Sequence, residues 1–350
     1  MSSVFYKTKP IVGLDITKTS VKIMAIDKNK MLVHGYGSIS LDPEKNDIDS
    51  EENVPYLAEK IRELLNNHIV GRIDSNRIAL GVSTSRTFSR TFSLPVKEEK
   101  NIRNAVDLEA EQYIPVPLDS LYLDYQVIKR TKDDLTVLTC AAPKKIIDNA
   151  LAAVQACGLE TALIEPDVNA IARLLKRTED GMLPTVIVDI SQATTDIAIL
   201  DNDIRVTGGL SVGSHTLTLE LAKKMDVPIE TAHQLKVLNG LNPSPRQARI
   251  TAALRPSLLK ITNEVKRVIR YYVDRFPDET KIEQVLIVGG GSNLPGIGDF
   301  FTNELVMPAR VASPWQSLNF GSLDQPAKQL RSQFASVAGL ALIRPEDIND

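Results

Sequence analysis

The sequence predicts an α/β protein built of two similar halves that face each other across a cleft. A segment near the start of each half is repeated, because Leu14–Asn29 (LDITKTSVKIMAIDKN) and Val188–Asp203 (VDISQATTDIAILDND) align without a gap. Each copy has an apolar lead-in, an Asp, a Ser/Thr-rich bend and an alternating apolar strand. In addition, the apolar run Val285–Val288 leads directly into Gly289-Gly290-Gly291, where bare backbone lets a ligand approach closely.

Composition places the chain among ordinary globular proteins of two or three domains. It has 350 residues, of which 43% are hydrophobic and 24% charged. The net charge of −3, with no cluster of Lys and Arg among aromatic residues, argues against nucleic acid as a partner. We expect neither a signal peptide nor a transmembrane helix, and therefore a cytoplasmic protein. The two cysteines and four histidines indicate neither a disulfide framework nor a metal site.

The first half, expected over residues 1–84, begins with a β-meander. Ile11–Asp27 contains two strands and a turn, and Met31–Leu41 predicts a third strand. Val54–Asn67 carries apolar residues at helical spacing, and Arg77–Val82 is typical of a buried strand.

A subdomain inserted between the halves is expected over residues 85–167. Its order of strand, helix, strand, strand, helix, strand is that of a split βαβ unit. The predicted elements are Thr87–Leu94, Lys97–Gln112, Leu121–Lys129, Leu135–Ala142, a helix between Pro143 and Gly158, and Leu159–Ile164. Proline at the first helical position and glycine at the carboxyl cap bracket that second helix.

The second half is expected over residues 168–350. It repeats the hairpin and adds several helices, the last of which is expected to return to the first half. Helices are predicted over Val168–Arg177, His215–Met225, Ile229–Leu238, Ser257–Phe276, Gly298–Leu305 and Gln329–Leu342.

Together, the two bends and the glycine turn resemble the phosphate-1, phosphate-2 and adenosine segments of the actin-like ATPase and sugar-kinase superfamily. The resemblance implies a duplicated, ribonuclease-H-like, actin-like two-lobed fold that binds ATP or ADP with Mg²⁺. It implies that Asp15 and Asp189 hold the ion through water and that Lys22 contacts phosphate. The residues implied to surround the nucleotide are Asp15, Thr17, Lys18, Thr19, Ser20, Lys22, Asp189, Ser191, Thr194, Thr195, His233, Lys236, Gly289, Gly290, Gly291, Ser292 and Asn293.

Three positions depart from the superfamily's pattern. Thr17 and Ser191 replace the glycines of the two bends, and a side chain there costs about 1–3 kcal/mol if the bend needs a positive φ. Their hydroxyls still offer hydrogen bonds to phosphate. His233 stands where the superfamily often has Glu, three residues before Lys236. We therefore expect nucleotide binding with at most slow ATP turnover, and no catalytic residue is assigned.

Simpler interpretations of these residues stay open. Asp15 and Asp189 have the chemistry to cap their own turns. The helix with His233 and Lys236 has the composition of a solvated face.

The insertion distinguishes members of the superfamily. A split βαβ unit at this place resembles the FtsA and PilM families. The segment Asp107–Asp119 (DLEAEQYIPVPLD), which runs into LYLDYQV, resembles the Glu-Ala-Glu-x-Tyr-Ile-Pro segment of the PilM family of type IV pilus assembly proteins. FtsA carries a C-terminal amphipathic membrane helix, which the acidic residues 344–350 do not supply, so PilM is favoured.

Resemblance to PilM implies an actin-like scaffold that lies peripherally at the inner face of the cytoplasmic membrane without inserting into it. The N-terminal tail of a PilN-like membrane protein would dock between the first half and the insertion, and pilus motor or platform proteins are further candidate partners. Tyr113, Ile114 and Pro115 are candidate groove residues. Alternatively, these residues end a helix, because a residue before proline avoids helical angles.

Two other functions within the superfamily remain alternatives. One is an FtsA-like division filament protein. The other is a small-molecule kinase, which needs a general base near the γ-phosphate, and the sequence offers none beyond the two aspartates of the bends.

Overall fold

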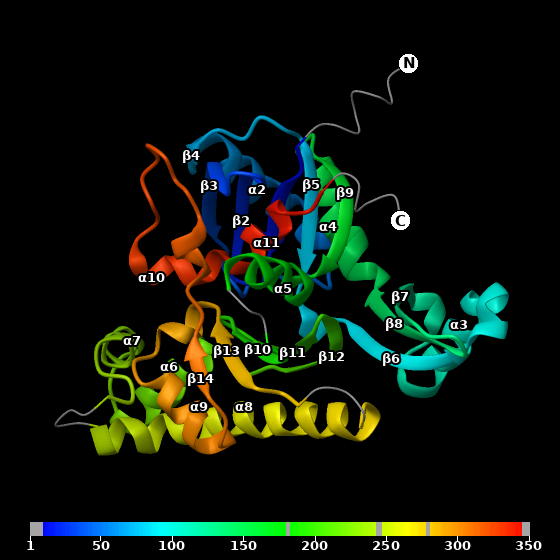
Figure 1. Ribbon diagram of the computed structural model, residues 1–350. Coiled ribbons are helices and arrows are strands. Elements are labelled where there is room, and N and C mark those ends of the chain that lie inside the picture. The colour runs from blue at the N-terminus through cyan, green and yellow to red at the C-terminus, as the bar shows by residue number, and fades with distance from the viewer. Residues whose placement is uncertain (1–9, 180–182, 243–246, 278–280, 345–350) are drawn as a thin grey trace.

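The computed structural model describes residues 10–179, 183–242, 247–277 and 281–344. Two large sheets form two lobes, and a third, smaller sheet projects to one side of the first lobe (Figure 1). The predicted α/β, two-lobed fold is confirmed.

The sheet of the first lobe has six strands in the order β4-β3-β2-β1-β5-β9. These strands are β1 (Val12–Ile16), β2 (Ser20–Asp27), β3 (Leu32–Ser40), β4 (Ile69–Gly71), β5 (Arg77–Val82) and β9 (Glu160–Pro166). Strand β1 pairs antiparallel with β2 and parallel with β5. Every residue of β5 is buried, as expected for a central strand that is covered on both faces.

The sheet of the second lobe has five strands in the order β12-β11-β10-β13-β14. These are β10 (Thr185–Ile190), β11 (Thr195–Asp201), β12 (Asp203–Leu210), β13 (Gln284–Val288) and β14 (Ala309–Val311). Strand β10 pairs antiparallel with β11 and parallel with β13, so it occupies the place that β1 has in the first lobe.

Equal strand registers establish that the two halves are structural repeats. Asp15 lies opposite Lys22 in the β1–β2 pair, and Asp189 lies opposite Asp196 in the β10–β11 pair. Because register decides which face of the sheet each side chain takes, equivalent residues face equivalent directions in the two lobes.

The repeats share even an irregularity. The register of β2 against β3 shifts between Ala25 and Ile26, and that of β11 against β12 shifts between Ile199 and Leu200. These positions correspond in the aligned repeat, so the duplication predicted from the sequence is confirmed down to its β-bulge.

The helices form three layers around the sheets. Helices α2 (Val54–Asn67) and α4 (Lys144–Gln155) cover the outer face of the first sheet. Helices α6 (Ser214–Met225), α8 (Gln247–Arg275) and α9 (Ile297–Leu305) cover the outer face of the second, and α7 (Ile229–Leu238) packs on α6. Between the sheets lie α5 (Asp167–Thr178) and α11 (Ala335–Ala341), which share one apolar core with both lobes (Figure 1).

The central helices approach each other and the sheet very closely. A Cβ atom added to Gly339 of α11 would come 1.9 Å from the backbone oxygen of Ala170 in α5. A Cβ atom on Gly13 of β1 would come 2.2 Å from the oxygen of Val337. Glycine at these two positions lets α11 wedge between α5 and the first sheet.

Three predicted helices have wrong bounds. The helix expected over Lys97–Gln112 is divided into a 3₁₀ helix over Val96–Asn101 and the α-helix α3 (Ile102–Tyr113). Helix α8 begins at Gln247 and continues through Pro256, although proline favoured a start at Ser257. The buried side chains of Ile250 and Leu254 extend its apolar stripe, so packing keeps the first turns helical. The last helix is divided into α10 (Lys328–Arg331), a short 3₁₀ turn and α11.

The insertion is smaller than predicted. Its own sheet has the order β6-β8-β7, with β6 (Phe88–Pro95), β7 (Leu121–Arg130) and β8 (Asp134–Pro143), and α3 (Ile102–Tyr113) packs against it. Strand β9 instead pairs in parallel with β5, and α4 packs on α2. The boundary expected at 167 is therefore too late, because β9 and α4 belong to the first lobe.

Candidate functional site

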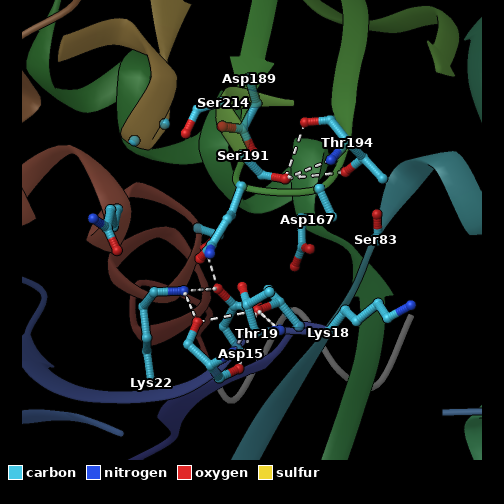
Figure 2. A pocket seen from close by; sticks show the side chains of 18 of the residues that line it. Asp15, Lys18, Thr19, Lys22, Ser83, Asp167, Asp189, Ser191, Thr194 and Ser214 are labelled. Carbon is cyan, nitrogen blue, oxygen red and sulfur yellow. Dashed lines mark hydrogen bonds and ion pairs between the residues drawn. The ribbon is translucent and has the colours of Figure 1, made fainter. Parts of the chain in front are cut away.

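A cavity of about 410 Å³ lies between the two lobes. Both bends, the glycine turn, α6, α7 and the region before α11 line it (Figure 2). All residues predicted to surround a nucleotide line this cavity except Thr195 and Ser292. Thr195 Oγ1 donates to the backbone oxygen of Val212 at 2.7 Å, and Ser292 Oγ donates to that of Gly289 at 2.7 Å. These two buried hydroxyls brace the neighbouring loops.

The first bend, which follows β1, is closed by the hydroxyl of Thr17. Thr17 Oγ1 accepts from the backbone N–H groups of Ser20 at 3.1 Å and Thr19 at 3.4 Å. The backbone N–H of Thr17 donates to the oxygen of Ser20 at 2.9 Å. Such a hydroxyl-capped turn needs no partner outside the bend.

The second bend, which follows β10, is closed in the same way by Ser191. Ser191 Oγ accepts from the backbone N–H of Thr194 at 3.1 Å and pairs with Thr194 Oγ1 at 3.1 Å. The backbone N–H of Ser191 donates to the oxygen of Thr194 at 2.9 Å. The two bends are thus equivalent in sequence position and in hydrogen bonding, and they face the same cavity from opposite lobes (Figure 2).

The strain expected from the missing glycines does not arise. Neither Thr17 nor Ser191 has a positive φ. Each side chain supplies a hydrogen bond that holds the bend in an ordinary backbone conformation, so replacing glycine has not distorted the turn.

Asp15 is held in the cavity by two hydrogen bonds. Its Oδ2 accepts from Lys22 Nζ at 3.3 Å and from Ser336 Oγ at 2.7 Å, and Lys22 Nζ also donates to Ser20 Oγ at 2.9 Å. Asp15 is 1% exposed, and among the described residues its Oδ1 has no hydrogen-bond partner. A buried carboxylate oxygen without a partner is a candidate contact for a ligand or a hydrated ion.

Asp189 faces the cavity from the other lobe. Burial, together with the charges of Asp196 and Asp15, raises the pKa of Asp189 to about 7. The first residue of the glycine triplet, Gly289, has to be glycine for two reasons. Its φ is +79°, and a Cβ atom there would come 2.1 Å from Asp189 Oδ1.

Asp196 was not predicted, although it occupies the place of Lys22 in the aligned repeat. Its Oδ2 accepts from the backbone N–H of Thr84 at 3.1 Å and from Ser83 Oγ at 3.2 Å, and its Oδ1 accepts from the backbone N–H of Ser85 at 2.9 Å. Burial raises the pKa of Asp196 to about 6, and these hydrogen bonds oppose the rise. Asp196 therefore ties the second lobe to the loop that leaves β5.

Asp167 is a second carboxylate that the sequence did not reveal. It is the first residue of α5 and lies between the two bends (Figure 2). Its pKa is raised well above the usual value by burial and by the charges of Asp15, Asp196 and Asp189. A Cβ atom on Gly81 would come 2.1 Å from Asp167 Oδ1, so this carboxyl needs a glycine on β5. The position of Asp167 depends on how β9 and α5 pack against β5. No local sequence pattern predicts that packing.

The carboxylates fit a hydrated Mg²⁺ rather than a fully protein-ligated ion. Within the described ranges, no cluster of three or more acidic, His or Cys side chains has the geometry of a metal centre. Magnesium at nucleotide sites keeps several waters and needs only one or two carboxylates plus phosphate oxygens. Asp15, with its unpartnered oxygen, and Asp189 satisfy that lesser requirement.

Lys236 and His233 line the cavity from α7. Lys236 Nζ donates to the backbone oxygen of Ser214 at 2.7 Å and to Thr218 Oγ1 at 2.7 Å. Burial lowers its pKa to about 8. His233 is exposed at the mouth, and partial burial followed by the charge of Lys236 lowers its pKa. The interpretation of this helix as a wholly solvated face is wrong for Lys236, which is 6% exposed.

Apolar residues of the first lobe, several of them on α2 and α4, also line the cavity, and we call the part of the cavity beside them the side arm. The side arm is lined by Ile48, Val54, Leu57, Val82, Ile146 and Ala150. Polar groups at its edge include Asn53, Asn149 and Arg86, and Arg86 Nη1 lies 3.2 Å from Asp49 Oδ2. Because Arg86 precedes β6, the side arm reaches the place where the insertion leaves the first lobe.

The three residues predicted to line a partner groove lie elsewhere. Ile114 is 5% exposed and packs in the core of the insertion with Ala110 and Leu121. The hydroxyl of Tyr113 pairs with Thr139 Oγ1 at 2.8 Å, so this side chain also turns inward. Of the three, Pro115 is exposed, Tyr113 is half-buried and Ile114 is buried, so burial argues against Ile114, and a role in partner binding stays a prediction for Tyr113 and Pro115.

Comparison with solved structures agrees with the duplicated fold. The structure of a PilM-PilN type IV pilus biogenesis complex superimposes with a TM-score of 0.81 at 22% identity, over 98% of this chain and 99% of that one. The ethanolamine utilization protein EutJ from Carboxydothermus hydrogenoformans gives a TM-score of 0.58 at 17% identity, over 95% and 89%. ADP-bound MreB5 of Spiroplasma citri gives 0.51 at 14% identity, over 95% of each chain. At these identities the likeness shows the fold.

Curated relatives include cell division protein FtsA. The protein from Neisseria meningitidis serogroup B is 21% identical over 82% of this chain and 78% of its own length. The protein from Borreliella burgdorferi is 23% identical over 48% of this chain, a match that spans only 44% of the Borreliella protein. The helices of the described segments include none with the length and apolar character that crossing a bilayer requires. The family model for type IV pilus assembly protein PilM matches residues 13–345, so the chain belongs to the PilM family.

Proposed function

We propose that this chain is a nucleotide-binding platform protein of type IV pilus assembly, held at the inner membrane by the N-terminal tail of a PilN-like membrane protein. One observation carries the nucleotide half of the proposal. Two equivalent hydroxyl-capped bends, each directly after an aspartate, face one cavity from opposite lobes. Polyphosphate is the ligand class that such paired bends suit, because the backbone N–H groups of Lys18, Gln192 and Ala193 at their tips are not among the donors that close the bends.

Each side chain has a role in this proposal. Lys18 and Lys22 supply positive charge at the first bend, and Gln192 and Ala193 form the tip of the second. Asp15 and Asp189 would hold a hydrated Mg²⁺, which neutralises phosphate charge when bound. The MreB5 structures with ADP and with AMPPNP support the proposal, since nucleotide occupies related proteins of the same fold.

We propose binding with slow turnover. Asp167 lies between the bends, where a group that accepts a proton from an attacking water would be needed. Burial and the neighbouring carboxylates raise the pKa of Asp167, which favours its protonated form, and a protonated carboxyl does not accept that proton. This favours a nucleotide that acts as a structural ligand or switch.

Calorimetric titration of the full chain with Mg-ATP tests the nucleotide half. We expect micromolar affinity that becomes at least about tenfold weaker in Asp15→Asn and in Asp189→Asn, a loss of roughly 1.4 kcal/mol. Asp74→Asn is the matched control, because this carboxylate is 72% exposed on the first lobe. Absence of heat up to millimolar Mg-ATP, from protein that melts cooperatively, would contradict nucleotide binding.

The side arm is our candidate for the PilN-like tail. Apolar side chains on α2 and α4 offer pockets for alternate side chains of an extended peptide, and Asn53, Asn149 and Arg86 offer polar contacts to its backbone. Its position beside the root of the insertion agrees with docking between the first lobe and the insertion. The structural likeness to a PilM-PilN complex supports this choice of partner.

Titration with a synthetic peptide of the PilN-like tail tests this half separately. Ala150 lines the side arm, whereas Ala152 on the same helix is exposed. We expect Ala150→Trp to fill the arm and weaken peptide binding at least about tenfold, and Ala152→Trp to leave it unchanged. Equal effects of the two substitutions would place the peptide elsewhere.

A further inference from the structure

The segment between β3 and α2, residues 42–53, connects the first bend to the side arm. Asn46 in this segment is 0% exposed. Its Nδ2 donates to the backbone oxygens of Thr17 at 3.0 Å and Lys18 at 2.9 Å. One buried amide thus holds two consecutive carbonyls of the bend.

The orientation of the next amide follows from hydrogen-bond counting. Both hydrogens of Asn46 Nδ2 are used by the carbonyls of Thr17 and Lys18. The other amide atom of Asn46, Oδ1, therefore points to Asn53 and can only accept a hydrogen bond. Asn53 Nδ2 donates to it at 2.8 Å. The orientation of Asn53 is fixed in turn, and its Oδ1 is left without a partner among the described residues although Asn53 is only 5% exposed. A buried acceptor without a partner, such as Asn53 Oδ1, can accept a hydrogen bond from a ligand.

Asn53 lies at the edge of the side arm, and the same segment forms part of the arm's wall. Ile48 lines the arm, and its backbone oxygen accepts from Asn149 Nδ2 of α4 at 3.2 Å. Asp49 pairs with Arg86 at the root of the insertion. The segment therefore contacts the bend on one side, and α4 and the insertion on the other.

We propose that Asn53 accepts a hydrogen bond from a backbone N–H of the peptide in the side arm, and that the Asn53–Asn46 pair transmits this contact to the first bend. The inference rests on the proposed function, because it concerns how binding of the peptide affects binding of the nucleotide. A donor at Asn53 Oδ1 polarises the amide and strengthens the Asn53-to-Asn46 hydrogen bond, which orders Asn46 against Thr17 and Lys18. Peptide and nucleotide consequently bind with positive cooperativity.

Calorimetric titration of the full chain with Mg-ATP, alone and with saturating tail peptide, measures the coupling. We expect the peptide to tighten Mg-ATP binding at least about fivefold, and Mg-ATP to tighten peptide binding by the same factor, because coupling is reciprocal. In Asn53→Ala the peptide should bind more weakly, because it loses its hydrogen bond to Asn53, and the factor by which each ligand tightens the binding of the other should fall to about one. Asn66→Ala, an exposed position on the same α2 helix, keeps the wild-type factor.

The outcomes separate this inference from the function on which it rests. Wild-type coupling in Asn53→Ala overturns the relay. Two ligands that bind wild-type protein independently also overturn it, and leave the proposed function standing. Failure of wild-type protein to bind one of the ligands overturns both. If Asn53→Ala does not fold, Asn53→Asp keeps the shape but replaces the donor to Asn46 with an oxygen, and it must lose the coupling as well.

Discussion

At the scale of single residues, the cleft shows how a hydroxyl substitutes for glycine. Thr17 and Ser191 close their bends with side-chain hydrogen bonds at ordinary φ. The substitution changes how the bend is held, and it leaves the bend open to a ligand. A departure from a glycine motif therefore needs to be judged by the turn that replaces it.

The acids of the cleft make stability depend on pH. The pKa of Asp189 is about 7 in the folded protein and near 3.8 when unfolded, so between these values the folded state binds more protons. Stability of the free protein should consequently fall as pH rises from about 4 to about 7, by roughly 2–4 kcal/mol for this group. Asp189→Asn should flatten part of this slope, measured as the free energy of urea unfolding against pH.

Asp74→Asn serves as the control for this experiment, because its exposed carboxylate should leave the slope intact. Part of the slope should survive in Asp189→Asn, since Asp196 also has a raised pKa, of about 6. If the free energy of unfolding of Asp189→Asn depended on pH as steeply as that of the wild type, the pKa of Asp189 would not be raised in the folded protein.

Most of the nucleotide side of the cleft could be predicted because its residues follow two short repeated motifs and one glycine turn. Asp196 could have been found from the repeat itself, since it aligns with Lys22. Asp167 and Ser336 could not, because α5 and the region of α11 bring them to Asp15 only through long-range packing.

At the scale of elements, sequence patterns predicted which helices and strands exist better than where they pack. Strand β9 has the same pattern in either sheet, and only its pairing with β5 assigns it to the first lobe. Helix α8 continues through Pro256 because the apolar stripe on both sides of it is buried. Local propensity loses to tertiary packing at such places.

The contact between α5 and α11 predicts a large effect from one methyl group. Gly339→Ala should destabilise the protein by about 2–4 kcal/mol, because backbone lies 1.9 Å from the added Cβ and cannot give way as a side chain would. Gly298→Ala in α9 is the matched control, since its nearest neighbour would be 3.3 Å away. Urea unfolding of both variants checks this, and equal stabilities would contradict the close packing.

At the scale of the whole molecule, two features join the lobes. The central helices share a core with both sheets, and Asp196 of the second lobe accepts three hydrogen bonds from Ser83, Thr84 and Ser85. The hydrogen bonds to Asp196 are local and polar. A ligand in the cavity can therefore disrupt them more easily than it can disrupt the core around the central helices.

Removing this contact should loosen the lobes. Asp196→Ala leaves the backbone N–H groups of Thr84 and Ser85 without acceptors, so hydrogen exchange at these amides should quicken by about tenfold or more. Asp203→Ala, an exposed carboxylate of the same lobe, is the control. Unchanged protection of residues 83–85 would mean that the carboxylate of Asp196 does not hold this loop to the second lobe.

The structural equivalence of the two repeats also has a consequence for how a ligand lies. A cleft with true twofold symmetry would accept a molecule equally well in two opposite orientations, and half of the encounters would be unproductive. At one pair of equivalent positions the chain breaks this degeneracy, with the cation of Lys22 on one wall and the anion of Asp196 on the other. Duplication therefore supplied the two walls of the cleft, and differences in charge between equivalent positions make the walls unlike, so that the two ends of a ligand are distinguished.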